Sequence, residues 1–233
     1  MTSQPAPFVI GIDGPSGSGK SSVSRAVATR LGAGYLDTGA MYRALTWWCR
    51  HTEVDLGDAD AIITAALGLP LEIGDDPQAP TVAVDGTDVA AAIRTSEISS
   101  LVSTVATVPE VRVEMQRRQR ALIDDIAARH GACVAEGRDV TTVIAPDAQV
   151  RILLTASEEA RLRRRSLEVH GATDEAAIAA TRDQVVRRDR DDSTVSQFTE
   201  AADGVTVVDT SDLDFEGSVA AVMDVVVAAA RAS

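Results

Sequence analysis

The most informative segment for chemistry is a glycine-rich run that holds the only lysine of the chain. Residues 14–21 read Gly-Pro-Ser-Gly-Ser-Gly-Lys-Ser and match the phosphate-binding loop pattern G-x-x-x-x-G-K-[ST]. In such a loop, backbone N–H groups turn toward a phosphate, and the following helix adds its partial positive charge. Lys20 would reach the β and γ phosphates, and the Ser21 hydroxyl would bind Mg²⁺. We therefore expect a nucleoside triphosphate to bind at Gly14, Pro15, Ser16, Gly17, Ser18, Gly19, Lys20, Ser21 and Ser22.

The flanks of this loop agree with that interpretation. Residues 8–12 form a short apolar run typical of a buried strand. Residues 21–31 place Val23, Val27 and Leu31 at a spacing of four, which predicts a helix that Gly32 would end. A strand, the loop and a helix in this order are the context in which the pattern binds phosphate, so a glycine-rich turn without a ligand is a poor alternative.

The positive charge of the chain comes almost entirely from arginine. With 22 basic and 35 acidic residues the net charge is −13, which argues against a protein that coats nucleic acid. Arginines nevertheless gather in short clusters, which suits a small polyanionic ligand that enters a cleft. A solvated basic helix face is the alternative for any one cluster. The clusters are Arg117, Arg118 and Arg120; Arg161, Arg163, Arg164 and Arg165; and Arg187, Arg188 and Arg190.

The composition is that of a globular protein, with 45% hydrophobic and 24% charged residues. No apolar run approaches the roughly 20 residues that cross a bilayer, and the start lacks the pattern of a secretory signal. The two cysteines, Cys49 and Cys133, have no metal-binding or redox spacing. We therefore expect a soluble protein of the reducing cytoplasm, without a membrane partner.

The order of predicted elements indicates an α/β fold. Apolar segments at 8–12, 35–36, 132–135, 150–154 and 205–208 alternate with helical stretches, which predicts a parallel sheet covered by helices on both faces. Between 58 and 94 the pattern changes to two short strands, at 69–73 and 81–84, followed by an Asp85-Gly86 hairpin turn. A long helix with proline in its first turn is expected over 109–129.

A phosphate-binding loop alone does not identify the reaction, because GTPases, motor ATPases and small kinases share it. The chain has no N-K-x-D motif for guanine, and at 233 residues it is short for a motor, which leaves small kinases. Residues 12–20 and 35–43, the latter with Thr38 expected to cap a helix, closely resemble the bacterial cytidylate kinase family. Further matches follow in family order, from about residue 8 to about residue 230. They are Ile93-Arg94-Thr95, Ser103, Val105-Ala106, Pro109, Val111-Arg112, Arg117-Arg118-Gln119-Arg120, Glu136-Gly137-Arg138-Asp139 and Arg188-Asp189.

The resemblance implies a P-loop kinase fold in a single domain, 1–233. Its core would comprise residues 8–37, 131–156 and 203–233. A monophosphate-binding insertion with a small antiparallel sheet would span 38–130, and a helical lid would span 157–195. The implied activity is transfer of the γ-phosphoryl group of MgATP to CMP or dCMP, by a monomer. A kinase of UMP or another monophosphate, and a nucleotide-binding switch without turnover, remain alternatives.

The residue types fit such a reaction. A monophosphate is already largely ionised at neutral pH, so the protein needs no catalytic base and must instead neutralise charge on the transferred group. The resemblance gives Lys20, Arg138, Arg161 and Arg165 catalytic roles. It assigns the acceptor to Thr38, Arg43, Ser103, Arg112, Arg138, Asp139, Arg188 and Asp192.

Within the acceptor set, Arg43 and Arg138 would hold the monophosphate, because a guanidinium fork matches phosphate oxygens. Ser103, Arg112 and Asp139 would contact the cytosine edge. Thr38 would lie beside the monophosphate, and Arg188 and Asp192 beside the ribose. Surface ion pairs or helix caps are the alternative roles of these residues. In the lid, Ser157 would start a helix that directs Arg161 and Arg165, rather than Arg163, at ATP.

Two departures from the family pattern stand out. Thr141-Thr142 occupies the position of a usual Gly-Thr pair. After Thr194 the chain is about two residues short and lacks the usual arginine and Ser-Pro-Leu. Arg187 or Arg190 could compensate for that arginine; otherwise the monophosphate contact is weaker or the substrate preference differs.

Overall fold

The computed structural model describes residues 7–194 and 196–232. Within this part, side chains are not described at 168–170, 175, 180, 183, 184, 186–188, 191, 192 and 232. In the described chain, no helix has the length and apolar character needed to cross a membrane.

The core is a five-stranded sheet in which every neighbouring pair is parallel, in the order β2-β6-β1-β7-β8. This confirms the predicted parallel sheet, with each strand within a few residues of its expected place. The strands are β1 (Phe8–Asp13), β2 (Gly34–Asp37), β6 (Ala132–Gly137), β7 (Val150–Thr155) and β8 (Thr206–Asp209).

Helices cover both faces of this sheet, and the pleat of β6 shows how. Val134 faces one buried cluster that includes Val27 of α1 (Lys20–Leu31) and Val222 of α8 (Phe215–Ala232). Cys133 and Ala135 face a second buried cluster with α2 (Thr38–His51) and α5 (Pro109–His130). Alternate residues of a strand point to opposite faces, so an almost wholly apolar strand is what a sheet buried on both sides requires.

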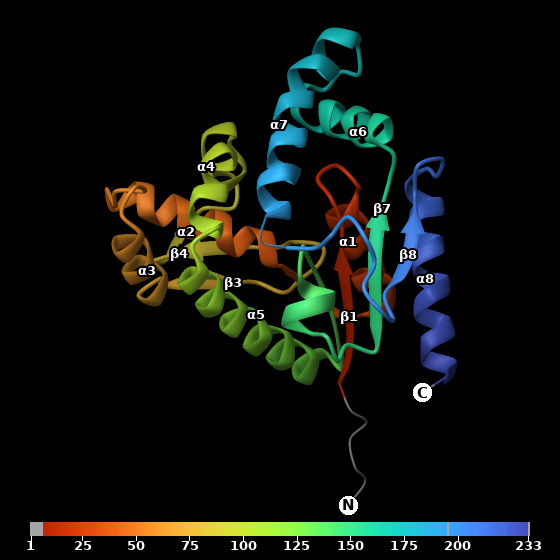
Figure 1. Ribbon diagram of the computed structural model, residues 1–233. Helices are drawn as coiled ribbons and strands as arrows, with labels where there is room; N and C mark the ends of the chain where they lie inside the picture. The colour runs from red at the N-terminus through yellow and green to blue at the C-terminus, as the bar shows by residue number, and fades with distance from the viewer. Residues whose placement is uncertain (1–6, 195, 233) are drawn as a thin grey trace, which may run out of the picture.

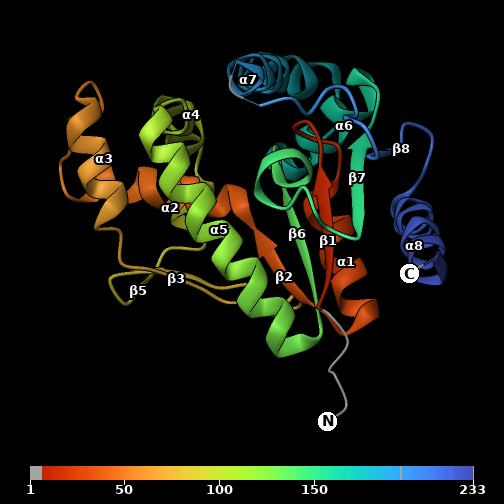
Figure 2. The same ribbon diagram turned by 60° about the horizontal axis from the view of Figure 1, so that its bottom comes forward.

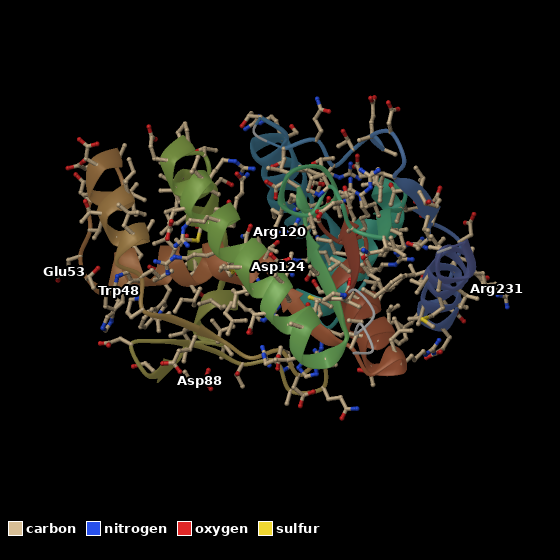
Figure 3. All side chains as sticks on the ribbon, turned by 90° about the horizontal axis from the view of Figure 1, so that it is seen from below. Trp48, Glu53, Asp88, Arg120, Asp124 and Arg231 are labelled. Atoms are coloured by element: carbon tan, nitrogen blue, oxygen red, sulfur yellow. The ribbon has the colours of Figure 1, made fainter. Side chains whose placement is uncertain are left out.

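A second, antiparallel sheet of order β3-β4-β5 is separate from the five-stranded sheet but packs into the same buried cluster as Leu36 of β2 (Figure 2). It consists of β3 (Leu71–Ile73), β4 (Val82–Val84) and β5 (Thr87–Asp88). Asp85 and Gly86 both have positive φ, 49° and 69°, which confirms the predicted hairpin turn. Figure 3 shows Asp88, on this sheet, and Arg231, at the end of α8, on opposite sides of the molecule.

The other elements of this region are helices: α3 (Ala59–Leu67), the 3₁₀ turn η1 (Ala92–Arg94) and α4 (Ser96–Ala106), followed by α5. The helix α5 confirms the predicted long helix with proline at its first turn. After β6 comes η2 (Val140–Ile144), a single π-helical segment. Segments of this kind are often found at functional sites.

The helices α6 (Glu158–His170) and α7 (Glu175–Ser193) form a hairpin above the loop that joins β1 to α1 (Figure 1). Ser157 caps α6, as predicted, because its Oγ accepts a hydrogen bond from the backbone N–H of Ala160 at 3.3 Å. The helix α7 packs against α6 and also against α4. The hairpin therefore contacts both the core and the inserted region.

Candidate active site

The glycine-rich loop connects the end of β1 to the first residue of α1, which is Lys20. Gly17 and Gly19 have φ angles of 76° and 86°, in the left-handed region that other residues rarely adopt. The Lys20 ammonium lies 3.4 Å from the carbonyl oxygen of Pro15, across the loop. The predicted sequence of strand, loop and helix is thus present, with its backbone wrapped around the lysine.

A buried carboxylate lies beside this loop. The Ser21 hydroxyl donates to Oε1 of Glu136 at 2.5 Å, and the Tyr35 hydroxyl donates to the same oxygen at 3.1 Å. Glu136 is only 2% exposed at the end of β6. Burial, and then the neighbouring Asp37 carboxylate, raise the pKa of Glu136 above its usual value. The site therefore holds acidic oxygen atoms next to the predicted metal ligand.

A second carboxylate, Asp37, organises arginines at the start of α2. Nη2 of Arg43 lies 2.8 Å from Asp37 Oδ2, and Nη2 of Arg94 lies 3.5 Å from the same oxygen. Burial raises the pKa of Asp37, but Arg43 and then Arg94 outweigh burial, so the net pKa is lowered. The Nε–H of Arg43 is buried and has no hydrogen-bond partner among the described residues. A buried donor without a partner is costly, which points to a ligand at this atom.

The helix cap here differs from the prediction. The carboxylate of Asp37, not the hydroxyl of Thr38, caps α2 by accepting from the N–H of Ala40 at 2.8 Å. The Thr38 hydroxyl instead donates to the carbonyl oxygen of Glu136 at 2.7 Å. Asp37 was the stronger candidate in the sequence, because aspartate is a better N-cap residue than threonine.

A third charged group joins α5 to the end of β6. Nη2 of Arg112 donates to Asp139 Oδ2 at 2.6 Å and to the hydroxyl of Ser196 at 3.0 Å. The side-chain amide of Gln116 donates to the same Asp139 oxygen at 3.0 Å. The structure therefore brings Arg112 and Asp139 together, as the resemblance implied. It adds Gln116, one helical turn after Arg112, and Ser196, from the segment after α7.

The two residues that follow Asp139 are anchored by the carboxylate of Asp13. The buried Asp13 carboxylate accepts from the backbone N–H groups of Val140 and Thr141 and from the Thr141 hydroxyl, at 3.0, 2.7 and 2.7 Å. Burial raises the pKa of Asp13 to about 6, although the bonds from Thr141 and Val140 act in the opposite direction. Thr141, at a position where the resemblance led us to expect glycine, thus supplies a donor to this carboxylate and anchors the segment that follows Asp139.

The arginines of α6 differ in what they contact. Arg161 donates to the carbonyl oxygen of Ser16 at 3.0 Å, whereas Arg163 pairs with exposed Glu159 on the solvent side, as predicted. Arg165 lines the cleft described below. Arg164 is a structural residue: it donates to Ser18 O at 3.2 Å and to Thr210 O at 2.6 Å, and so connects α6 to the loop and to the end of β8.

Arg138 extends from the end of β6 to the loop. It donates to the carbonyl oxygen of Gly14, and its guanidinium carbon lies 4.5 Å from the ring centroid of Phe198. The aromatic face favours the cation there. Arg138 thus lies between the loop and the groups around Arg43 and Arg112, which all line one cleft.

That cleft has a volume of about 440 Å³, enough for small-molecule ligands. Its walls come from the loop, α1, the start of α2, the small sheet, α4, α5 and the end of β6. The predicted residues that line it are Ser16, Gly17, Gly19, Lys20, Ser21, Ser22, Thr38, Arg43, Arg112, Arg138, Asp139 and Arg165.

Some predicted residues lie elsewhere. Ser103 is not among the lining residues, which on α4 are Val102 and Ala106. The side chains of Arg187, Arg188 and Asp192 lie outside the described part of the chain. Arg190 is exposed to solvent.

Other charged and polar residues of the site were not assigned a role from the sequence. Glu136 and Arg94 lie within segments that resemble the family, and Asp37 directly follows the predicted strand 35–36, so their positions gave a signal. Gln116 and Ser196 gave none, because only the fold brings them to Asp139.

The comparisons with known proteins cover nearly the whole chain. The family model described as cytidylate kinase matches residues 10–228. A protein of Streptomyces avermitilis named cytidylate kinase is 48% identical over 220 residues, covering 94% of this chain and 92% of that protein. Proteins of the same name from Streptomyces griseus and Cutibacterium acnes are 47% and 48% identical, over 94% and 95% of this chain and 92% and 96% of their own. This likeness confirms the resemblance drawn from the motifs: the chain belongs to the cytidylate kinase family and is a nucleoside monophosphate kinase.

Proposed function

We propose that this chain transfers the γ-phosphoryl group of MgATP to CMP or dCMP and releases ADP with CDP or dCDP. The observation that carries the proposal is the composition of one cleft. A phosphate-binding loop lies on one side of it, and a second set of guanidinium groups, held by carboxylates, lies on the other. A protein that held only one nucleotide would have no use for the second set.

The loop side suits the triphosphate. The backbone of residues 14–19, the start of α1 and Lys20 concentrate positive potential where the β and γ phosphates would bind. Arg138 and Arg161 already donate to loop carbonyl groups, so their guanidinium groups lie next to that position. Charge that develops on the transferred phosphoryl group would be stabilised by preorganised cations, with little rearrangement.

The metal fits the residues present. Mg²⁺ prefers oxygen ligands and is commonly held by one or two protein groups together with substrate phosphates. The Ser21 hydroxyl and the Glu136 carboxylate, in contact at 2.5 Å, would supply those oxygens, one directly and one through water. When bound, the ion would neutralise phosphate charge; the protein groups orient it.

The opposite side suits a cytidine monophosphate. Arg43 has an unused buried N–H and a partner, Asp37, that holds its orientation, so it is ready to bind a phosphate. Asp139 could accept from the amino group of cytosine, and Arg112 could donate to the ring acceptors. Uracil carries an oxygen where cytosine carries the amino group, and that oxygen would face the Asp139 carboxylate unfavourably. This contrast argues against UMP as the preferred acceptor.

The α6–α7 hairpin would act as the lid, within residues 157–195, over the core and the monophosphate-binding region that the resemblance implies. Closure over ATP would bring Arg161 and Arg165 to the phosphates and exclude water, which would otherwise accept the phosphoryl group. Thr38 would lie near the monophosphate, while Ser103, Arg188 and Asp192 remain predictions for contacts with the base and ribose. A monomer also remains a prediction. A cytoplasmic location would keep the buried thiols of Cys49 and Cys133 reduced.

A coupled assay of ADP release tests the function. With MgATP fixed, CMP, dCMP, UMP and AMP are each varied, and a reaction without acceptor is the control. We expect turnover with CMP and dCMP, and kcat/KM at least about tenfold lower with UMP and AMP, since loss of a base hydrogen bond costs on the order of 1–3 kcal/mol. Equal use of UMP would support the broader kinase. ADP release that no acceptor accelerates would support the switch.

A further inference from the structure

One carboxylate of the α6–α7 hairpin reaches into the core and has no role in the mechanism above. Asp189, on α7, has a side chain that is only 14% exposed. Its Oδ1 accepts from the backbone N–H of Ser16 at 2.9 Å, within the phosphate-binding loop. The Arg161 guanidinium donates to its Oδ2, and Nη2 of Arg138 lies 3.5 Å from Oδ1.

The two arginines that contact Asp189 are also fixed from the opposite side. Arg161 donates to Ser16 O, and Arg138 donates to Gly14 O, so each guanidinium spans from a loop carbonyl to the carboxylate. Two cations placed close together repel each other, and each is costly to bury without a partner. A carboxylate between them removes both penalties. A guanidinium has five N–H donors, so each arginine keeps others for a phosphate.

We propose that Asp189 is a positioning residue for phosphoryl transfer, which aligns Arg138 and Arg161 on the phosphate-binding loop when the α6–α7 hairpin is closed. Because Asp189 belongs to α7 and Ser16 to the loop, closure of the hairpin and alignment of the arginines become one event. The proposal rests on the transfer reaction proposed above.

A second α6–α7 contact provides a matched control. Arg182 of α7 pairs with Glu158 of α6 at 2.6 Å, with side chains that are 57% and 49% exposed. This pair joins the same two helices without touching the loop. Arg182→Ala therefore weakens the hairpin alone, whereas Asp189→Ala also releases the arginines. Asp189→Asn keeps the size of the side chain and an oxygen that can accept from the Ser16 N–H, but it removes the negative charge. This variant therefore replaces Asp189→Ala in the test if the alanine variant does not fold.

Steady-state kinetics give the first readout. We expect Asp189→Ala to lower kcat about tenfold to a hundredfold, the value of one or two charge-assisted hydrogen bonds, while KM for CMP and ATP changes by less than about threefold. Asp189→Asn should fall between this variant and the parent, and Arg182→Ala should stay within about twofold. In an Arg161→Ala background, Asp189→Ala should lower kcat by a smaller factor than in the parent, because one of the two arginines that it positions is gone and Arg138 remains. Equal kcat for Asp189→Ala and Arg182→Ala, or a full loss in the Arg161→Ala background, would overturn the proposal.

Amide hydrogen exchange of peptides that cover the loop gives a second readout that needs no turnover. Without nucleotide, Asp189→Ala should speed exchange at Ser16 by about tenfold or more, and Arg182→Ala should not. Unchanged exchange would show that the carboxylate does not hold the loop. Should the parent protein fail to phosphorylate CMP or dCMP, the proposed function would be wrong, and the exchange result would still decide whether Asp189 makes this contact.

Discussion

The two sides of the cleft are built in different ways. The proposed ATP half, residues 14–22, is one continuous segment whose backbone would form the phosphate site. The proposed CMP half consists of side chains from the β2–α2 junction, α5 and the segment after β6, namely Asp37, Arg43, Arg112 and Asp139. Arg112 is 27 residues from its partner Asp139 and 84 residues from Ser196. Local sequence therefore specifies the first half, whereas only the completed fold assembles the second.

This difference also concerns how each half carries charge. In the proposed ATP half, glycines and the N-terminus of α1, which has no side-chain cap, supply backbone N–H groups. In the CMP half, each arginine is already held by a carboxylate: Arg43 by Asp37 and Arg112 by Asp139. A prearranged ion pair keeps a guanidinium in one orientation, at the cost of sharing its donors. A substitution in one half should therefore weaken the binding of the ligand of that half and leave the binding of the other ligand nearly unchanged.

The largest effect is expected at the single lysine. Lys20→Arg should lower kcat on the order of a hundredfold or more, because a planar guanidinium cannot occupy the space within the loop where the ammonium lies 3.4 Å from Pro15 O. The melting temperature should change little, since the lysine is not part of the buried core. The coupled assay and a thermal melt check both parts. A near-normal rate would remove Lys20 from the mechanism.

A smaller and more selective effect is expected in the CMP half. Arg43→Lys replaces a fork with a single point of charge and should raise KM for CMP about tenfold to a hundredfold, with KM for ATP within about twofold. Arg50→Lys, on the exposed side of the same helix, is the matched control and should be near normal. If KM for ATP rose as much as KM for CMP, the two halves would not be separable.

The smallest effect is expected at Asp13 and Thr141, which anchor the segment that follows Asp139. Folding raises the pKa of Asp13 from 3.8 to about 6, so this group's contribution to the free energy of unfolding falls as pH rises through that window. Thr141→Ala removes a donor to the ionised carboxylate and should raise that pKa further. We expect Thr141→Ala to lower the free energy of unfolding by about 1–3 kcal/mol at about pH 7.5, and by less at about pH 5, where Asp13 is mostly protonated. Urea unfolding at both pH values measures it, with Thr142→Ala as the control. A loss that does not depend on pH would contradict this account of Asp13.

The sequence predicted the core well because each of its elements carries a local signal. Apolar runs marked the five strands, glycines marked the loop, and Asp85-Gly86 marked the hairpin. The same local signals placed residues 14–22 in the site. The resemblance, rather than any periodicity, brought Arg43, Arg112 and Asp139 to one acceptor site.

The remaining features of the site could not be predicted from the sequence, because they depend on tertiary contacts. Thr38 is of a residue type that is common at helix N-caps, but the adjacent Asp37 caps α2 and also orients Arg43. Glu136 looked like one residue of a motif, yet the fold buries its carboxylate against Ser21. Nothing in the spacing indicated that Asp189 would meet Ser16, which is 173 residues away. Such contacts join side chains of segments that are far apart in the sequence, and they can be identified only from the three-dimensional structure.

Calorimetric titration of the Asp139→Asn variant tests the separation of the two halves most directly. This change preserves the shape of the side chain but removes the negative charge that holds Arg112 and that, in our proposal, faces the acceptor. MgATP and CMP are titrated separately into this variant, into the parent and into an Arg117→Ala control on the solvent side of the same α5 helix. The account predicts that Asp139→Asn weakens CMP about tenfold or more while MgATP changes by less than about twofold. Equal weakening of both ligands would contradict it.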